Sequence, residues 1–523
     1  MEHLKDFRIT GGSIGDLLGR RARELGDRPF LTFPMAPPNP GTDVTRTFRQ
    51  LDERVNGLAR GLAGLGIGAG SFSAAMLSNC VQLVENSFAV KRLGAVEVAI
   101  PPGYRGAALA RMIGLTGASV LVTESASVDA IVEVCDRTPE LRTVVLTDCA
   151  AERVPADVGG LVFRAYEDVV SDDTGPLALP PVHPSSLASI LFTSGSTGLS
   201  KGVMMTHSFQ LLQADIHSYI LGKGADDVTY GFYPLYNMGG TCTVLSALVH
   251  GSRGVLAPRF TASRFWSEVK RHGITMFTVQ GTVGKILWDL PPGPHERDHR
   301  VRQIVGVPLT RAPEEFAERF DAEIVTEDVY GSSESGVFLP AAPGTDGRDR
   351  VLHQLEVADE YDQPLPTGEV GEILVRPKIP FGCFSGYFDD PGATAEKSRN
   401  LWYHTGDLGR FEPDGTLTFI GRTAEKIRSR GKNLSALEIE SAIAPLPGVA
   451  AVAVVGRQNE TGEDDIVAFV TLAPGASVSE EDVLAIAQAN LPRIMWPEQV
   501  RVIETMPVTD TGKIAKHLLR ERV

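Results

Sequence analysis

The most informative segment of the chain is a stretch rich in glycine and hydroxyls, Leu191-Phe192-Thr193-Ser194-Gly195-Ser196-Thr197-Gly198-Leu199-Ser200-Lys201-Gly202. It lies between two apolar runs, over 187–192 and 203–205, that are typical of buried strands. Glycines let backbone N–H groups turn toward an anion, hydroxyls add donors, and the lysine adds a full positive charge. The segment predicts a phosphate-binding loop, although an ordinary polar turn explains this loop equally well when it is taken alone.

The spacing of the glycines and the lysine narrows the class of nucleotide-binding protein. The loop reads G-x-x-G-x-x-K, whereas the P-loop of Walker-type NTPases reads G-x-x-x-x-G-K-[ST]. A Walker-type NTPase is therefore excluded, and further motifs must distinguish a phosphate loop from a turn.

Length, composition and charge set the broad class of the protein. The 523 residues exceed the size of a single hydrophobic core, so we expect at least two domains. The hydrophobic content of 43% and the charged content of 22% are those of a soluble globular protein. The formal net charge of -15 argues against a nucleic-acid partner, whose phosphates would be repelled. Any anionic ligand must therefore be held by local donors.

Cysteines and apolar runs bear on the compartment. Five cysteines are scattered without a C-x-x-C pair, which predicts reduced thiols and neither a disulfide framework nor a zinc site. The first residues lack the apolar core of a signal peptide, and no apolar run approaches the length of a bilayer span. We expect a soluble, cytoplasmic protein without integral membrane association.

Segments with helical and with strand character alternate in the N-terminal part of the chain. Leucine and valine recur at spacings of three and four between Leu51 and Leu65, which predicts one face of a helix. Thr47 and Gln50 have the spacing of a capping box at its start. Strands are predicted over 72–77, 95–100 and 119–123, and helices over 80–92 and 107–115. This alternation indicates parallel strands with covering helices and hence an α/β class.

The composition changes near residue 421. A short polar stretch, Gly421-Arg422-Thr423-Ala424-Glu425-Lys426, precedes what reads as a new α/β unit. Its predicted elements are a helix from Ser435, strands over 449–455 and 466–472, and a helix from Ser479. We expect a domain boundary at this stretch. The charged run over 294–300 is expected to be a solvated loop.

Two further clusters carry residues suited to a nucleotide. The first reads Val329-Tyr330-Gly331-Ser332-Ser333-Glu334, and it offers an aromatic to stack a base, hydroxyls for a phosphate and an acid for a cation. The second reads Tyr403-His404-Thr405-Gly406-Asp407, and its carboxylate can accept hydrogen bonds from both hydroxyls of a ribose. Ordinary turns explain either cluster on its own.

Two cationic motifs complete the set. Gly421-Arg422 offers a guanidinium to a ribose or a phosphate. Pro507-Val508-Thr509-Asp510-Thr511-Gly512-Lys513 presents a lysine on a glycine turn. Either cation, considered singly, is consistent with ordinary solvated charge. Five such elements in this order are not expected by chance.

On these motifs the chain resembles, from Thr47 to Lys513, the adenylate-forming superfamily of acyl-CoA synthetases, adenylation domains and luciferases. The resemblance implies an α/β fold, with a large N-terminal α/β domain of stacked sheets over 1–421 and a small mobile C-terminal α+β domain over 422–523. It places a hinge at Glu425. It implies an AMP-forming acyl-CoA synthetase, similar to the carnitine-CoA ligases, that joins a carboxylic acid to coenzyme A through an acyl-adenylate.

The same resemblance assigns roles to the motif residues, with ATP, Mg²⁺ and coenzyme A as cofactors. Lys201 and the loop residues Thr193, Ser194, Gly195, Ser196, Thr197 and Gly198 would hold the ATP phosphates. Tyr330 would pack on adenine, Ser333 would contact the α-phosphate, and Glu334 would bind Mg²⁺. Gly331 and Ser332 are also assigned to cofactor binding. Asp407 and Arg422 would take the ribose, and Lys513 would bridge the substrate carboxylate and the α-phosphate. Lys513, Arg422 and Lys201 are the implied catalytic residues.

The acceptor and the acid are also inferred from the resemblance. Arg430, Gly431 and Lys432 resemble the hairpin of carnitine-CoA-ligase-like synthetases that lines the pantetheine tunnel. No carrier-protein domain follows Lys513, so a built-in peptide synthetase module is not expected. Glycines in the implied acyl wall leave room and no second cation awaits the substrate, which favours a hydrophobic acid of medium-chain, aryl or terpenoid type. Alternatively, these glycines serve only backbone geometry. The wall comprises Tyr236, Asn237, Met238, Gly239, Gly240, Phe277, Gln280, Gly281 and Val337.

Departures from the family pattern leave other functions open. Ser200 replaces the usual proline, Asn237 the usual histidine, Ser333 the usual threonine and Glu425 the usual aspartate. Because these changes fall mostly on the ATP half-reaction, one alternative is a ligase that only converts an acyl-AMP, supplied by a partner enzyme, to a thioester. Others are an enzyme that loads a separate carrier protein, a non-catalytic nucleotide or acyl-CoA sensor, and a luciferase-type oxygenase. A monomer and a homodimer are both compatible with the sequence.

Overall fold

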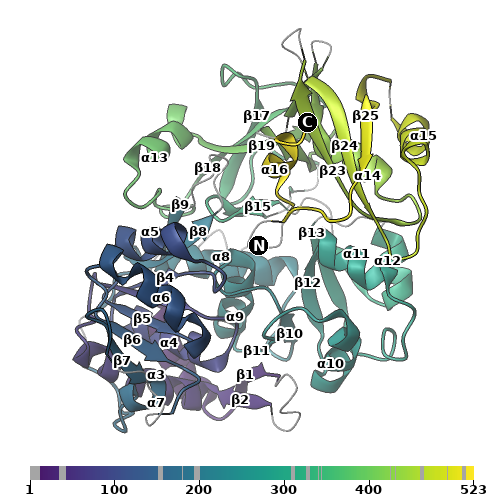
Figure 1. Ribbon diagram of the computed structural model, residues 1–523. Helices are drawn as coiled ribbons and strands as arrows, with labels where there is room; N and C mark the ends of the chain where they lie inside the picture. Colours follow the sequence, from purple (N-terminus) through teal and green to yellow (C-terminus); the bar gives the residue numbers. More distant parts are fainter. Residues whose placement is uncertain are drawn as a thin grey trace. The chain divides into compact units, whose positions relative to one another are not determined.

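The protein is described by a computed structural model (Figure 1). Contacts within the chain divide it into two compact units. The first unit comprises residues 1–340, 350–353 and 377–396, and the second comprises residues 341–349, 354–376 and 397–523. The described residues are 12–34, 43–150, 157–178, 181–193, 201–307, 313–325, 330–339, 341–342, 344–423, 426–429, 432–459, 464–491, 493–508 and 514–523.

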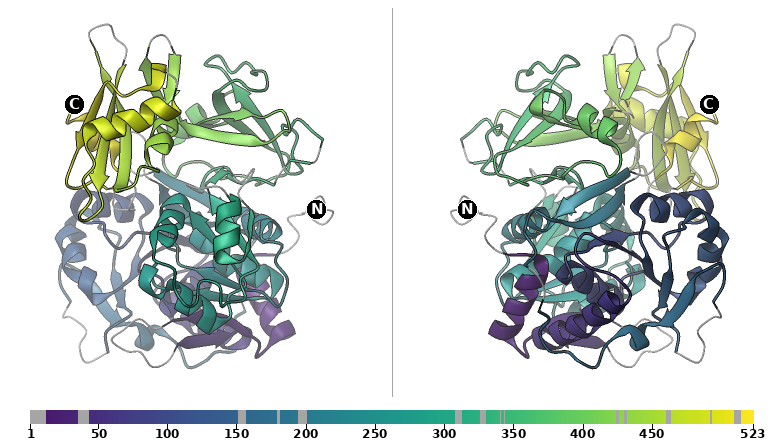
Figure 2. Two further views of the ribbon diagram at one scale, coloured as in Figure 1. Left: turned by 90° about the vertical axis from the view of Figure 1, so that its right-hand side faces the viewer. Right: turned by 90° about the vertical axis from the view of Figure 1, so that its left-hand side faces the viewer.

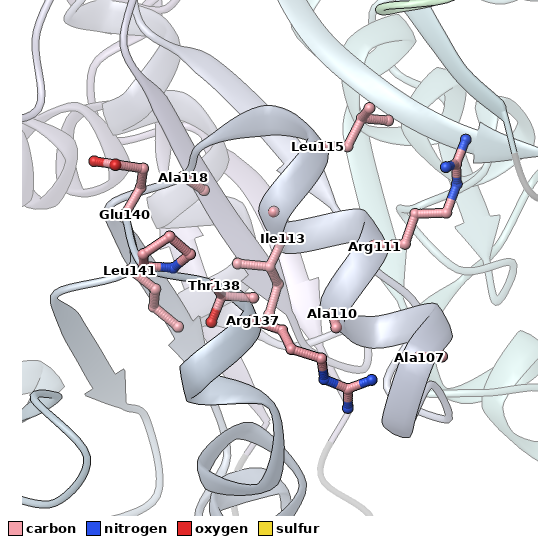
Figure 3. Close-up of a pocket in the computed structure, with 12 residues that line it drawn as sticks. Ala107, Ala110, Arg111, Ile113, Leu115, Ala118, Arg137, Thr138, Glu140 and Leu141 are labelled. Atoms are coloured by element: carbon pink, nitrogen blue, oxygen red, sulfur yellow. The ribbon is translucent and has the colours of Figure 1, made fainter.

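Two seven-stranded sheets form the framework of the first unit (Figures 1 and 2). Neighbouring strands are parallel, except for the antiparallel pairs β8–β9 and β1–β2. The first sheet has the order β7 (Val162–Ala165), β6 (Thr143–Leu146), β5 (Val120–Thr123), β3 (Phe72–Met76), β4 (Val96–Ala99), β8 (Leu187–Thr193), β9 (Lys201–Thr206). The second has the order β14 (Glu323–Val325), β13 (Gln303–Val307), β12 (Met276–Gln280), β10 (Val228–Gly231), β11 (Arg253–Leu256), β1 (Pro29–Phe33), β2 (Val44–Thr47).

Helices cover both faces of each sheet, so the first unit is built in layers. Between the sheets lie α2 (Ile14–Leu25), α3 (Phe48–Gly64), α4 (Val81–Arg92), α8 (His207–Ile220) and α9 (Met238–His250). On the far face of the first sheet lie α5 (Gly106–Thr116) and α6 (Val128–Val134). On the far face of the second lie α10 (Phe265–His272), α11 (Gly281–Asp289) and α12 (Pro313–Phe320). Two short helices, α7 (Tyr166–Val169) and α13 (Pro391–Lys397), complete this unit.

The layering explains why the central strands of the first sheet, β3, β4 and β5, are largely apolar on both faces, with few polar residues such as Ser73 and Glu97. Side chains alternate between the faces of a strand, so Leu121 packs with α5 and α6 while Val120 and Val122 pack with the helices between the sheets. A parallel sheet buried on both faces therefore reads as a continuous apolar run. The predicted α/β class is confirmed, and so is the capping box, in which Thr47 and Gln50 each accept a backbone N–H bond.

Among its described residues, the second unit has three smaller sheets and three α-helices. A four-stranded sheet has the order β17 (His353–Ala358), β18 (Gly371–Pro377), β19 (Tyr403–Phe411), β20 (Leu417–Arg422). Next come a hairpin, β21 (Lys426–Ser429) and β22 (Lys432–Ser435), and a sheet of β23 (Val449–Gln458), β24 (Asp464–Leu472) and β25 (Gln499–Val502). The helices are α14 (Ala436–Ile443), α15 (Glu480–Asn490) and α16 (Lys516–Arg520). The predicted boundary between residues 421 and 422 falls inside this unit, at the end of β20.

The charged run over 294–300 is largely exposed, as expected of a solvated loop, but one of its residues is an exception. Glu296 is only 6% exposed and forms an ion pair with Arg319, at 3.2 Å. Arg319 also lies over the rings of Trp288 and Phe320. The run is therefore not wholly a solvated loop, because one of its carboxylates is buried against a cation that the sequence places 23 residues away. Among the described helices, none combines the length and the apolar character needed to cross a lipid bilayer.

Candidate active site

The flanks of the predicted phosphate loop form an antiparallel strand pair. β8 ends at Thr193, β9 begins at Lys201, and the register pairs these two residues directly. Both side chains are partly exposed. The pairing holds the two ends of the loop together at the edge of the first sheet. Ser194, Gly195, Ser196, Thr197 and Gly198 of the loop itself lie outside the described residues.

Thr193 and Lys201 belong to a group of four side chains with Glu334 and Tyr387, which we call the Glu334 cluster. Oε1 of Glu334 accepts hydrogen bonds from the Tyr387 hydroxyl at 3.1 Å and from Thr193 Oγ1 at 3.4 Å. The Lys201 ammonium lies over the Tyr387 ring, with Nζ 5.1 Å from its centroid. Thus the carboxylate contacts the hydroxyl of Tyr387, and the ammonium contacts the face of its ring.

The chemistry of this cluster suits an anion accompanied by a hard cation. Mg²⁺ is usually bound in proteins by one or two carboxylates together with substrate phosphates, and Glu334 provides one carboxylate beside a hydroxyl. Within the described ranges no group of three or more His, Cys, Asp or Glu side chains forms a complete metal cage. The single carboxylate of Glu334 beside a hydroxyl fits a Mg²⁺ ion that is shared with a phosphate.

The segment before Glu334 forms a small hairpin of β15 (Gly331–Ser332) and β16 (Gly336–Val337). Tyr330, 8% exposed, precedes it and packs on Phe338, with ring centroids 5.6 Å apart. Ser332 Oγ lies 2.9 Å from Ser335 Oγ, whereas Ser333 is partly exposed in the turn. The buried amide oxygen of Gln213, a residue that no sequence motif indicated, accepts the Val337 N–H at 2.6 Å and so fixes the hairpin on α8.

Two adjacent glycines of the predicted acyl wall, Gly239 and Gly240, lie at the N-terminus of α9 but in different surroundings. A Cβ built on Gly239 meets no atom within 4 Å, whereas one on Gly240 lies 2.2 Å from the Pro234 carbonyl oxygen. Gly239 therefore borders open space, and Gly240 serves a close backbone contact. Asn237 is the N-cap of α9 without a side-chain capping bond. Tyr236 is partly buried, and burial raises the pKa of its phenol.

Strand β12 carries one of the predicted wall residues, Phe277, on the face that packs in the core. Phe277 is 0% exposed and packs on Phe265 and Trp266 in the aromatic core. Thr278 points to the opposite face, where its hydroxyl lies 3.1 Å from Nε2 of His217 on α8. The structure therefore does not group Phe277 with Tyr236 and Asn237. Of the remaining predictions, Gln280 donates its N–H to the Tyr233 hydroxyl at 2.7 Å, Gly281 begins α11, and Val337 is partly exposed.

In the second unit, the structure brings Asp407 and Arg422 together. The register of β19 and β20 pairs them, and Arg422 Nε lies 3.1 Å from Asp407 Oδ1. The carboxylate side chain is 5% exposed and the guanidinium side chain 53%. Gly406 has φ +74°, a conformation that favours glycine. The pair therefore offers a fixed acid next to an accessible cation.

A second layer holds the turn that carries Asp407. Oε1 of Glu372 accepts the Gly406 N–H at 2.9 Å, and its Oε2 lies 3.1 Å from His404 Nδ1. Thr405 Oγ1 accepts the Asp407 N–H at 3.0 Å and donates to the Ile373 carbonyl at 2.8 Å. Lys432 begins β22. The predicted Glu425, Arg430, Gly431 and Lys513 lie outside the described residues.

The clusters around Glu334 in the first unit and Asp407 in the second have the side-chain types expected of an adenylate-forming ligase, the class that the sequence motifs predicted. Comparison with protein families agrees: the model described as AMP-binding enzyme matches residues 18–388, and the model described as AMP-binding enzyme C-terminal domain matches residues 438–513. The chain belongs to the AMP-binding enzyme family.

Individual relatives extend this result. The chain is 29% identical to a crotonobetaine/carnitine–CoA ligase of Escherichia coli O9:H4 (strain HS), over 91% of this chain and 93% of that protein. The fold matches the anthranilate CoA ligase AuaEII in complex with anthranoyl-AMP, with a TM-score of 0.84 at 22% identity, covering 98% and 97% of the chains. It also matches ATP-bound MatB from Rhodopseudomonas palustris, with a TM-score of 0.80 at 21% identity, covering 97% and 98%.

Proposed function

We propose that the protein is an AMP-forming acyl-CoA synthetase that converts a hydrophobic carboxylic acid to its CoA thioester through an acyl-adenylate. The observation that carries the proposal is the Glu334 cluster, in which Lys201 and Glu334, far apart in sequence, contact the same tyrosine. A site that must bind a polyphosphate with its cation needs both signs of charge close together but not joined.

The chemistry asks little proton transfer of the protein. A carboxylate is already ionised at neutral pH, so its attack on the α-phosphorus of ATP needs positioning and charge neutralisation. We assign the ATP phosphates to Thr193, Lys201 and the loop between them, and the α-phosphate to Ser333. Glu334 would hold Mg²⁺, which when bound neutralises phosphate charge.

The remaining roles are proposed on the same basis. Tyr330 packs against the adenine, Asp407 and Arg422 bind the ribose, and Lys513 neutralises the charge that develops at the α-phosphate. The 430–432 hairpin serves coenzyme A. The domain boundary at residues 421 and 422, with a hinge at Glu425, is part of this proposal.

We place the acyl chain of an apolar acid beside Gly239, where a Cβ would meet no atom within 4 Å. Tyr236, Asn237, Met238, Gln280, Gly281 and Val337 are the proposed neighbours of the acyl chain. We expect Gly239→Val to exclude bulky acids while a short acid is still activated. Gly240→Ala should instead destabilise the fold, because its Cβ meets the Pro234 carbonyl, so thermal unfolding distinguishes this packing glycine from Gly239. Equal acid profiles for wild type and Gly239→Val would contradict this placement of the acyl chain.

The decisive experiment is ATP–pyrophosphate exchange over a panel of aliphatic, aryl and polycyclic acids, with wild type beside Lys513→Ala. Synthetic acyl-AMP with coenzyme A is assayed in parallel. Acid-dependent exchange that is lost in the variant supports a complete synthetase and identifies the acid class. Thioester formation without exchange would favour the alternative in which a partner enzyme supplies the adenylate. If the protein catalyses neither reaction, the result contradicts the proposal and favours a sensor.

A further inference from the structure

Resting on this proposed function, we infer that Tyr387 is a positioning residue that orients Glu334 for the cation and seats Lys201 for the phosphates. Its hydroxyl and its ring do separate jobs, because the hydroxyl contacts the carboxylate and the ring face carries the ammonium. Neither contact requires that Tyr387 touch the reacting atoms.

The backbone around Tyr387 is fixed from several sides. Residues 384–388 run alongside β9, with the Phe388 N–H donating to Gly202 at 2.8 Å and the Met204 N–H donating to Gly386 at 3.0 Å. The Tyr387 N–H donates to Thr394 Oγ1 at 2.9 Å. Gly386 has φ +108°, a conformation from which a side chain would be largely excluded. The segment therefore presents Tyr387 in one place.

The same segment is tied to Glu334 through its backbone. The Phe384 N–H donates to the Glu334 carbonyl at 2.9 Å, and the Phe384 ring stands edge-on to the Tyr387 ring at 5.1 Å and 68°. Tyr387 is 5% exposed. Because strand β9 also begins with Lys201, one rigid unit determines the distance between the lysine, the tyrosine and the carboxylate.

The orientation of the carboxylate follows from its hydrogen bonds. Thr193 and Tyr387 both donate to Oε1 of Glu334, and within the part of the chain that the structure describes no hydrogen bond to Oε2 is found. Two donors on one oxygen restrict rotation of the carboxylate and direct the other oxygen to a cation. An aromatic face attracts an ammonium without neutralising it, so Lys201 keeps its full charge for an anion.

Calorimetric binding of ATP, with and without Mg²⁺, tests the inference because it needs no turnover. Tyr387→Phe removes the hydroxyl and keeps the ring, whereas Tyr387→Leu removes both. Tyr166→Phe is the matched control, since Tyr166 is also buried and donates to a carboxylate, Glu85 at 3.1 Å, outside the cluster.

Mg²⁺ should lower the Kd for ATP by about tenfold less in Tyr387→Phe than in wild type, because charged hydrogen bonds are among the stronger ones. The affinity of Tyr387→Phe for ATP without Mg²⁺ should stay within about twofold of wild type. Tyr387→Leu should in addition weaken ATP alone by about three- to tenfold, the range of a partly desolvated cation–π contact. Tyr166→Phe should match wild type in both.

Unchanged Mg²⁺ dependence in Tyr387→Phe would overturn the inference, and so would an equal loss with and without the metal. If Tyr387→Phe melts below the assay temperature, the cluster is probed from the other side: Glu334→Gln should abolish most of the Mg²⁺ effect, and Thr193→Val should reduce it less than Glu334→Gln does. A Mg²⁺ effect that survives Glu334→Gln also overturns the inference. Failure of wild type to bind ATP would instead contradict the proposed function.

Discussion

Two antiparallel strand pairs, β8–β9 and β19–β20, carry candidate functional side chains, but they treat charge differently. In β19–β20 the paired residues Asp407 and Arg422 form a direct ion pair at 3.1 Å. In β8–β9 the paired residues are Thr193 and Lys201, and the lysine rests on an aromatic ring. Among the described residues no ion pair joins Lys201 to Glu334. In the first arrangement the carboxylate and the guanidinium neutralise each other. In the second, the Lys201 ammonium and the Glu334 carboxylate both remain available to a ligand.

This difference predicts that the largest loss of activity follows from replacing Lys201, whose charge is not neutralised by an ion pair with Glu334. Lys201→Ala should reduce ATP–pyrophosphate exchange by roughly 10²- to 10³-fold, the range seen when a donor to developing negative charge is removed. Lys201→Arg keeps the charge and should retain more activity, although its geometry differs. Steady-state exchange rates measure both, and equal rates for Lys201→Ala and wild type would remove the lysine from the site.

Changes in the Asp407–Arg422 ion pair should affect the binding of ATP more than the catalytic rate. Asp407→Asn removes the charge but keeps the shape, and we expect KM for ATP to rise about tenfold with kcat changed little, since a charged hydrogen bond contributes about 1.5–3 kcal/mol. Comparison with 2′-deoxy-ATP sharpens the test. Wild type should discriminate between the two nucleotides and Asp407→Asn should not; discrimination that persists in the variant would argue against a ribose contact.

A smaller effect is expected from the layer behind Asp407. Glu372→Ala leaves the Gly406 N–H without its carboxylate acceptor and should raise KM for ATP by roughly threefold. An unpaired donor costs about 1–3 kcal/mol when fully buried, and this one is only partly buried. Glu372→Gln keeps an acceptor oxygen and should restore most of the affinity. If both variants behave alike, the carboxylate does not act through this turn.

Lys223 extends the comparison to a buried cation that forms no ion pair among the residues the structure describes. Its ammonium contacts Ser246 Oγ at 2.5 Å, and burial lowers its pKa from 10.5 to about 7. Between these values the unfolded chain binds a proton that the folded chain does not, so this residue makes stability rise with pH across that window, by at most about 1.4 kcal/mol per pH unit.

Lys223→Met should remove this pH dependence and leave activity unchanged. We expect the Tm of the variant to exceed that of wild type most clearly near pH 7 and the difference to shrink toward pH 10. Thermal unfolding followed across this pH range measures the effect. A difference that stays constant with pH would mean that the lysine remains protonated in the folded protein.

The order of elements and most motif residues could be predicted because they depend on neighbours in sequence. The capping box at Thr47 and the strand at 119–123 follow from local periodicity and side-chain chemistry. The residues missed are those whose partners are remote. Tyr387 meets a carboxylate 53 residues away, and His217 meets Thr278 across 61 residues, and neither carries a local pattern.

The sequence by itself determined the α/β class, the two strands around the phosphate loop and the family. Periodicity, glycine-rich turns and ordered motifs are local properties, and each can be recognised without knowing what lies opposite. The tertiary structure alone decided that Gly239 borders open space while Gly240 packs on backbone, and that Phe277 belongs to the core. It also decided that Lys201 and Glu334 share one tyrosine, because strand register and chain crossings, not neighbouring residues, set those distances.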